Sequence, residues 1–196
     1  MKKIHIVLFD DFAVLDVFGP AAVFSCMKDW YEIGYYSVGG GVVPGSAGMK
    51  AETEPLATVE DGGILFLPGG MGTRRLVHDT DFIAQIKRIA EHSENVLCVC
   101  TGSVLLAGTG LLDGRKATSN KLAWDWVTTQ NRQVDWIKKA RWVTDGKYYT
   151  SSGVAAGIDM SLGFTADQHG TAVAEKISRE LEYVWNRDRN DDVFAL

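Results

Sequence analysis

The sequence predicts an α/β fold in which helices cover both faces of a mostly parallel β-sheet. Short apolar runs of strand length alternate with longer stretches in which apolar residues recur at helical spacing. Hydrophobic residues make up 46% of the chain and charged residues 23%, an ordinary balance for a globular protein. The 196 residues suffice for one sizeable core without a break in composition, so residues 1–196 are expected to form a single domain.

The first half of the chain is expected to supply strands, helices and a small hairpin. Apolar runs indicate the strands, and glycine- and proline-containing segments indicate the turns between them. Pro20 is expected in the first turn of a helix, where its missing N–H is tolerated. In chain order, the expected elements are a strand at 3–9, a helix at 15–27, a strand at 31–38, a hairpin within 42–55, a strand at 63–67 and a helix at 79–92.

The second half contains another hairpin and ends in two helices and a polar tail. The dipeptide Asp145-Gly146 between two apolar runs is a strong hairpin signal. The tail at 187–196 is expected to fray because it begins with a run of polar residues. The expected elements are a strand at 96–99, a helix from about 104 to 107, a turn at 111–115, a short strand at 116–118, a helix at 121–129, strands at 140–144 and 147–151, and helices at 155–166 and 171–186.

Charge, hydropathy and cysteine content argue against several classes of protein. The net charge is −5 and the lysines and arginines are scattered, so nucleic-acid binding through a basic face is not expected. No apolar run reaches the length of about 18 residues that a membrane span needs. Three cysteines, an odd number without disulfide spacing, indicate a protein of the reducing cytoplasm.

The segment from Asn95 to Ala107 carries the strongest chemical signal. A strand that ends on Cys100 and turns at once into a helix places the thiol at the helix N-terminus, which favours a thiolate and lowers the pKa of the cysteine. The nucleophile elbow of serine hydrolases has the same geometry. The alternative is a small buried hydrophobic residue, which is our interpretation of Cys98 inside the apolar run. Cys100, in contrast, lies at the strand–helix junction, and this position favours a role as nucleophile.

Residues suited to chemistry follow three of the predicted strands. Asp16 comes after the first strand, Gly69-Gly70 comes after the strand at 63–67, and Cys100 comes after the strand at 96–99. Ligands of parallel α/β sheets bind beyond the carboxyl ends of the strands. This convergence predicts a small-molecule site at one edge of the sheet.

Four segments resemble the ThiJ/PfpI superfamily, which is related to class I glutamine amidotransferases. They are LDVFGP at 15–20, LPGGMG at 67–72, VCTGSVLLAGTGLLDGRKATSN at 99–120 and SSGVAAGID at 151–159. The resemblance implies a flavodoxin-like three-layer sandwich, a cysteine nucleophile on the sharp strand–helix turn, and a homodimer.

Histidines distinguish the branches of this superfamily. The protease-like branch has a histidine directly after the cysteine, where this chain has Thr101, and many relatives have another where this chain has Asn120. Cys-Thr-Gly combined with the aspartate of L-D-x-x-G-P resembles the isocyanide hydratase branch, and equally the ligand-binding domain of AraC-type regulators. Those regulators add a helix-turn-helix domain for which this chain has no residues left, so the stand-alone hydratase form is expected.

The candidate residues have both structural and functional interpretations. Asp16 could cap its helix, or it could carry a proton beside the Cys100 sulfur, with a pKa raised by burial and like charge. Gly69 and Gly70 could form a tight turn, or they could form an oxyanion hole in which the Gly70 and Thr101 N–H groups meet negative charge. A nucleotide site is disfavoured because the third glycine of a dinucleotide fingerprint is missing.

Other polar residues have weaker assignments. The Thr101 hydroxyl could also cap the following helix. Asn120 and Ser152 could line the pocket or belong only to turns. Asp159, inside a predicted helix, is expected to bond to nearby backbone or to an arginine. No side-chain spacing predicts a metal site, and no cofactor is expected.

Three functions are compatible with these features. In the first, implied by the resemblance, Cys100 attacks a small isocyanide to give a thioimidate, and Asp16 assists its hydrolysis to an N-substituted formamide. The second is amide hydrolysis or glyoxal hydration at the same cysteine. The third is a redox sensor or small-molecule-binding protein without catalysis.

Overall fold

The computed structural model describes residues 1–195. Its centre is an eight-stranded sheet in the order β3-β4-β2-β1-β5-β6-β10-β9, and β7 and β8 form a separate pair. The strands are β1 (Lys2–Val7), β2 (Tyr31–Ser37), β3 (Gly41–Pro44), β4 (Lys50–Pro55), β5 (Ile64–Leu67), β6 (Asn95–Cys98), β7 (Lys116–Ala117), β8 (Asp135–Trp136), β9 (Trp142–Asp145) and β10 (Tyr148–Ser151). Within the large sheet only the β3–β4 and β9–β10 pairs are antiparallel, so the predicted mostly parallel sheet is confirmed.

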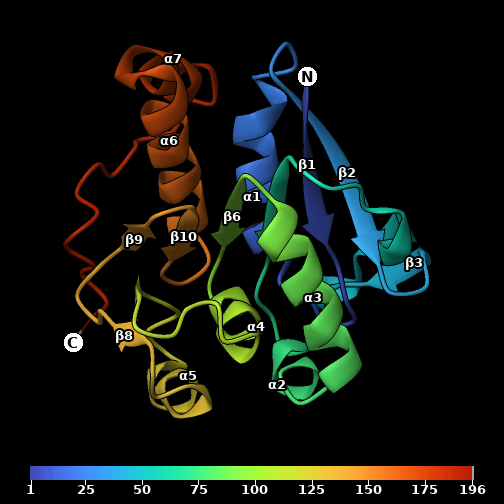
Figure 1. Ribbon diagram of the computed structural model, residues 1–196. Coiled ribbons are helices and arrows are strands. Elements are labelled where there is room, and N and C mark those ends of the chain that lie inside the picture. The colour runs from blue at the N-terminus through green and yellow to red at the C-terminus, as the bar shows by residue number, and fades with distance from the viewer. Residues whose placement is uncertain (196) are drawn as a thin grey trace.

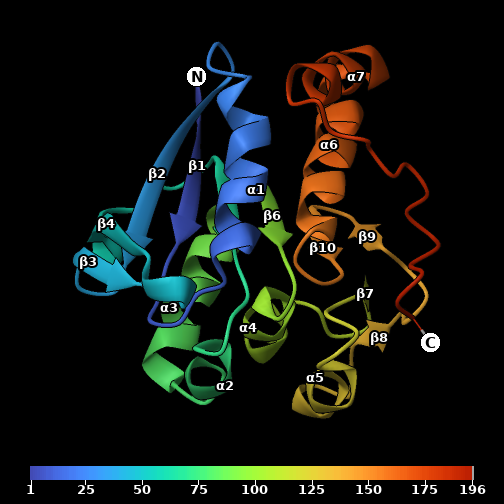
Figure 2. The same cartoon turned by 180° about the vertical axis from the view of Figure 1, so that it is seen from behind.

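The helices form a layer on each side of this sheet. They are α1 (Val14–Ser25), α2 (Thr73–Leu76), α3 (Thr80–His92), α4 (Gly102–Gly108), α5 (Trp124–Gln130), α6 (Ala156–His169) and α7 (Thr171–Glu180), with single 3₁₀ turns η1 (Ser46–Gly48) and η2 (Leu56–Thr58). Figure 1 shows α3 in front of the sheet, and Figure 2 shows α1 and α6 in front of its opposite face. The three-layer α/β sandwich is therefore confirmed.

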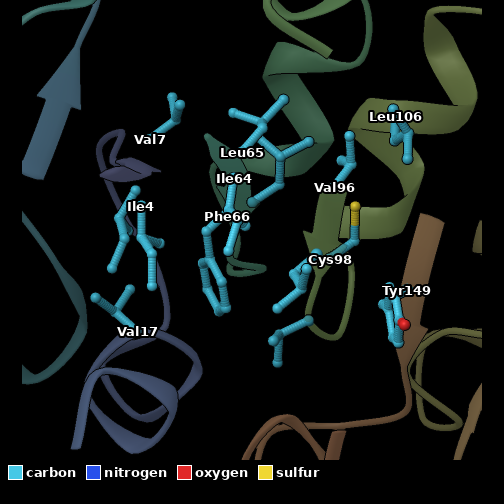
Figure 3. Close-up of a cluster of buried hydrophobic side chains, with 14 of the residues drawn as sticks. Ile4, Val7, Val17, Ile64, Leu65, Phe66, Val96, Cys98, Leu106 and Tyr149 are labelled. Atoms are coloured by element: carbon cyan, nitrogen blue, oxygen red, sulfur yellow. The ribbon is translucent and has the colours of Figure 1, made fainter. Parts of the chain in front are cut away.

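The core lies between the sheet and these helices because the central strands are apolar along their whole length. All four residues of β5 are buried, and so are Val96, Leu97 and Cys98 of β6. Figure 3 shows side chains from β1, β5 and β6 in one apolar cluster, with Val17 of α1 on one side and Leu106 of α4 further along. Cys98 is 0% exposed and burial raises its pKa, as expected for a residue of the core.

Several short helices gather where the parallel strands end. Figure 1 shows the arrows of β1, β2 and β6 pointing toward the edge at which α2, α4 and α5 lie. The loop after β1 is joined to the loop after β5, because the Ala13 N–H donates to the Gly69 carbonyl oxygen at 2.9 Å. This edge therefore brings the predicted site residues together.

Two expectations about the helices were wrong. Pro20 lies inside α1 rather than in its first turn, and its missing N–H leaves the carbonyl of Asp16, four residues earlier, without a helical donor. Helix α7 ends at Glu180 rather than at 186, and Glu182 follows with a φ of 49°, which a continuing α-helix does not allow. The short elements α2 and β8 were not predicted.

The described part of the tail that was expected to fray, residues 187–195, is docked on the sheet, and residue 196 lies outside the described residues. The Arg189 carbonyl oxygen accepts hydrogen bonds from the N–H groups of Arg141 and Trp142 at 2.8 and 3.3 Å. The side chain of Asp192 is 0% exposed and lies 3.8 Å from the Arg141 guanidinium. Long-range ion pairs and backbone hydrogen bonds, which local polarity does not reveal, hold this segment. No helix within residues 1–195 has the length and apolarity to cross a membrane.

Candidate active site

Cys100 lies on a strained turn between β6 and α4. Its φ is +56°, in the left-handed region that residues other than glycine rarely adopt. Its N–H donates to the Ser152 carbonyl oxygen at 3.1 Å, and its carbonyl oxygen accepts the Ser119 hydroxyl at 2.8 Å and the Ser103 hydroxyl at 3.1 Å. These bonds hold the turn from several sides, so the thiol has a defined direction. Cys100 is buried, with 6% of its surface exposed.

Asp16 is oriented toward the site and not toward the end of its helix. It lies in the first turn of α1, whose N-cap is Ala13 without a side-chain cap, so the capping interpretation was wrong. The residue is 0% exposed, and its Oδ2 accepts the Gly69 N–H at 2.9 Å. Within residues 1–195, its Oδ1 accepts no hydrogen bond of ordinary length. One oxygen is therefore anchored, and the other remains available for a proton.

The Asp16 carboxyl and the Cys100 thiol influence each other's ionisation. Burial raises the pKa of Asp16 to about 6, against the opposing effects of the Gly69 N–H and the Cys100 thiol as hydrogen-bond donors. Burial also raises the pKa of Cys100 to about 12, and the Asp16 charge acts in the same direction. Burial and the Asp16 charge thus act against the lowering of the cysteine pKa that the helix N-terminus alone led us to expect. At neutral pH the thiol is protonated and the carboxyl is mostly ionised.

Three hydrogen-bond donors surround the Cys100 sulfur and favour its charged form. They are the backbone N–H groups of Val154 and Thr101 and the side chain of Asn120. The Asn120 Oδ1 accepts the Ala123 N–H at 2.9 Å, which leaves the amide nitrogen to face the sulfur. Asn120 therefore stabilises a turn through its oxygen and also lies among the residues that line the pocket.

The Thr101 hydroxyl is used differently from what we expected. It makes no cap bond in α4, and it accepts the Gly70 N–H at 3.1 Å and the Thr73 hydroxyl at 3.0 Å. The Gly70 N–H, predicted to point at developing charge, is therefore already engaged in this structure. The N–H groups of Thr101 and Val154, which face the sulfur, are better placed to stabilise charge.

Gly69 is required by the closeness of these groups. A Cβ at this position would lie 2.7 Å from the Thr101 nitrogen and 2.8 Å from Asp16 Oδ2. Ordinary Cβ contacts are longer, so a side chain here would displace the carboxyl or the turn. Gly69 thus contributes to the site because the absence of a side chain leaves room for the Asp16 carboxyl and the Thr101 backbone.

A pocket of about 330 Å³ opens over Cys100, within the size range of small-molecule sites. Its lining residues are Asp11, Ala13, Ser46, Gly70, Met71, Arg74, Cys100, Thr101, Asn120, Leu122 and Ala123. Ser152 does not line it and instead contributes its carbonyl oxygen to the Cys100 turn. Within residues 1–195, no three His, Cys, Asp or Glu side chains are grouped as metal ligands would be.

Two contributors to this site were missed in the sequence. Val154 has a φ of +31°, and its N–H faces the sulfur, but a backbone donor leaves no trace in the residue type. Thr73 is fully buried and supports the Thr101 hydroxyl. It could have been found only by recognising α2, and a four-residue helix is too short for a periodic signal.

Comparison with known proteins gives consistent matches over most of the chain. The sequence profile of the DJ-1/PfpI family matches residues 2–166. An isonitrile hydratase of Pseudomonas putida is 31% identical over 184 residues, which cover 92% of this chain and 78% of that protein. The HTH-type transcriptional regulator CdhR of Pseudomonas aeruginosa is 30% identical over 164 residues, which cover 83% of this chain but only 48% of the regulator.

Solved structures agree with the sequence matches. A ThiJ/PfpI family protein from Pseudomonas syringae has a TM-score of 0.85 at 28% identity, covering 93% of this chain and 75% of that one. The DJ-1beta protein of Drosophila melanogaster has a TM-score of 0.78 at 18% identity, covering 94% and 99% of the two chains. The second similarity shows the shared fold alone.

Proposed function

The chain belongs to the DJ-1/PfpI family, and from that premise we propose that it is an isocyanide hydratase-like enzyme. It would add water to a small isocyanide and release an N-substituted formamide. The isonitrile hydratase of P. putida, 31% identical over 92% of this chain, supports this reaction. The site geometry supplies an independent argument.

The observation that carries the proposal is a buried carboxyl–thiol pair without a histidine. Asp16 and Cys100 act on each other's pKa, and none of the four histidines, all of which lie within the described residues, lines the pocket. Histidine-assisted hydrolysis therefore lacks its usual base. A carboxyl group with a pKa of about 6 can both accept and donate a proton near neutral pH.

In the first half of the reaction, the Cys100 thiol adds to the isocyanide carbon. The Asp16 carboxylate accepts the thiol proton as the sulfur forms a bond to that carbon, and the protonated carboxyl then delivers the same proton to the carbon. The product is a covalent thioimidate, in which the carbon carries one hydrogen and is doubly bonded to nitrogen. The donors around the sulfur stabilise the thiolate character that develops on the way.

In the second half, water hydrolyses the thioimidate. Asp16 accepts a proton from water as the water oxygen attacks the carbon, and it passes this proton to the substrate nitrogen. When the carbon–sulfur bond breaks, the sulfur leaves as a thiolate. The new hydroxyl group on the carbon becomes the formyl carbonyl, and the proton that it loses passes through Asp16 to the thiolate. One isocyanide and one water give one N-substituted formamide, and the enzyme is regenerated.

The test is hydration of a panel of isocyanides by the parent protein and by variants. Cys100→Ala should reduce turnover to background, and Asp16→Asn should reduce kcat by about 10²- to 10⁴-fold. Cys26→Ala, which removes a thiol far from the pocket, is the matched control. In the parent protein kcat/KM should fall below pH 6, as Asp16 takes up a proton. Full activity of Cys100→Ala would end the proposal, and activity on methylglyoxal or a chromogenic amide alone would redirect it.

A second candidate function is ligand binding without turnover. The 30% identity with CdhR over 83% of this chain supports it, because that protein is a transcriptional regulator. The raised pKa of Cys100 disfavours a thiolate at neutral pH. It therefore argues against an oxidation sensor, the other non-catalytic function considered. Saturable binding of a small molecule with no covalent adduct and no product would favour this function over catalysis.

A further inference from the structure

Arg74 is the one cationic side chain among the residues that line the described Cys100 pocket. It belongs to α2 and makes no ion pair with any residue within 1–195. The mechanism proposed above does not use it. This guanidinium is therefore free to bind a group of a ligand in the pocket.

The guanidinium of Arg74 is held by an aromatic ring. Its Cζ lies 4.3 Å from the centroid of the Trp126 ring, so the contact joins α2 to α5 beside the pocket. A cation–π contact of this length restrains a long side chain without using its N–H groups. The donors of the guanidinium edge therefore remain available for a planar acceptor.

The rest of the pocket determines what kind of group can reach Arg74. Ala13, Met71, Leu122 and Ala123 contribute apolar lining to the pocket. A volume of about 330 Å³ accommodates a short chain and one small terminal group. The Asp11 carboxylate also lines the pocket and disfavours an anion on its own side. One anionic group, directed to Arg74, satisfies these constraints.

We propose that Arg74 is the carboxylate-binding residue of this pocket, so that the substrate class is isocyanides whose N-substituent ends in a carboxylate. This assignment rests on the proposed function, which gives the isocyanide as the reacting group. It identifies the chemical group at the opposite end of the substrate. Arginine presents paired N–H donors that match the two oxygens of a carboxylate. The protein's net charge of −5 repels anions in general, so a preference for a carboxylate must arise locally.

The test measures binding with turnover removed. In a Cys100→Ala protein, calorimetry compares N-formyl-β-alanine, a carboxylate-bearing formamide, with its neutral isostere N-formyl-β-alaninamide. The acid should bind about tenfold more tightly, in line with a charge-assisted hydrogen bond, and this advantage should shrink as salt is added. Arg74→Gln should abolish the difference, and Arg74→Lys should restore part of it. Arg75→Gln, the neighbouring cation outside the pocket lining, should preserve it.

The proposal is overturned if acid and amide bind equally, if neither binds, or if the preference survives Arg74→Gln. Hydration of 3-isocyanopropanoate by the parent protein reports on the proposed function separately. Hydration without a carboxylate preference would refute the Arg74 assignment alone. A carboxylate preference without isocyanide turnover would refute the hydratase function and leave the anion site established.

Discussion

At the scale of single residues, the notable feature is a carboxyl group that is buried beside a thiol. Asp16 accepts hydrogen bonds only from the Gly69 N–H, at 2.9 Å, and from the Cys100 thiol, and no cation within residues 1–195 acts on its charge. Its ionised form is therefore poorly solvated, and burial is the largest cause of its raised pKa. This arrangement lowers stability in return for a group that titrates close to neutral pH.

The consequence for stability can be predicted with its sign. The pKa of Asp16 rises from 3.8 to about 6 on folding, so between these values the folded protein keeps a proton that the unfolded chain has released. The free energy of unfolding should therefore decrease as pH rises from about 4 to 6 and then level off. Asp16→Asn removes this dependence and should be more stable than the parent protein by up to about 3 kcal/mol at pH 7, with the difference approaching zero near pH 4.

Urea unfolding of both proteins at pH 4, 5, 6 and 7 measures this effect. Asp29→Asn, which removes an exposed carboxylate, corrects for the loss of one negative charge. A stability difference between Asp16→Asn and the parent protein that does not change with pH would contradict the prediction.

At the scale of elements, α4 is fitted closely against the end of β5. A Cβ on Gly102, the first residue of α4, would lie 2.2 Å from the Leu67 carbonyl oxygen. That atom belongs to backbone, which cannot rotate away. The glycine of the Cys-Thr-Gly sequence is therefore explained by packing, and this packing sets the position of the Cys100 turn.

Two glycines of the same helix provide a matched comparison. Gly102→Ala should destabilise the protein by about 3 kcal/mol or more, because backbone must shift to relieve the overlap. At Gly108 a Cβ would lie 3.2 Å from the end of the flexible Ile83 side chain. Gly108→Ala should therefore change stability by less than about 1 kcal/mol, with the better helix propensity of alanine in its favour. Chemical denaturation measures both, and equal losses would show that the contact with Leu67 is not decisive.

At the scale of the whole molecule, the C-terminal segment completes the structure around β9. Its anchor is Asp192, whose N–H donates to the Lys139 carbonyl oxygen at 2.7 Å and whose carboxylate lies near both Arg141 and Lys121. Arg141 also pairs with Asp159 at 2.7 Å, as expected for that aspartate. Lys121 precedes the loop to α5 and follows Asn120, so the tail and the site share one supporting network.

Neighbouring aspartates of the tail should differ sharply in their contributions. Asp192→Asn leaves the buried Lys121 without its carboxylate and Arg141 with Asp159 alone, and it should cost about 3 kcal/mol. Asp191 pairs with Lys139 at 2.7 Å, but these side chains are 49% and 68% exposed. Asp191→Asn should therefore cost less than about 1 kcal/mol. Thermal unfolding of the two variants, at low and high salt, checks the contrast. Similar losses would mean that the tail contributes little through Asp192.

Much of this architecture follows from local patterns in the sequence. The alternation of apolar runs with helical periodicity predicts the layers, and Asp145-Gly146 predicts the β9–β10 hairpin, because strand period and turn chemistry are properties of neighbouring residues. The site at the carboxyl ends of the strands was predicted for the same reason, and the structure brings Asp16, Gly69 and Cys100 together there.

The protonation of the site depends on tertiary structure alone. The raised pKa of Cys100 depends on burial and on Asp16, which is 84 positions away in a chain that must fold before the two groups meet. The partner of the Thr101 hydroxyl, the N–H of Val154 and the docking of the tail also come from distant segments. The sequence by itself determined most of the elements and the position of the proposed nucleophile, because those depend on local period and turns. The tertiary structure decided how the Cys100 thiol is charged, solvated and surrounded, because those properties arise only when separate segments exclude water together.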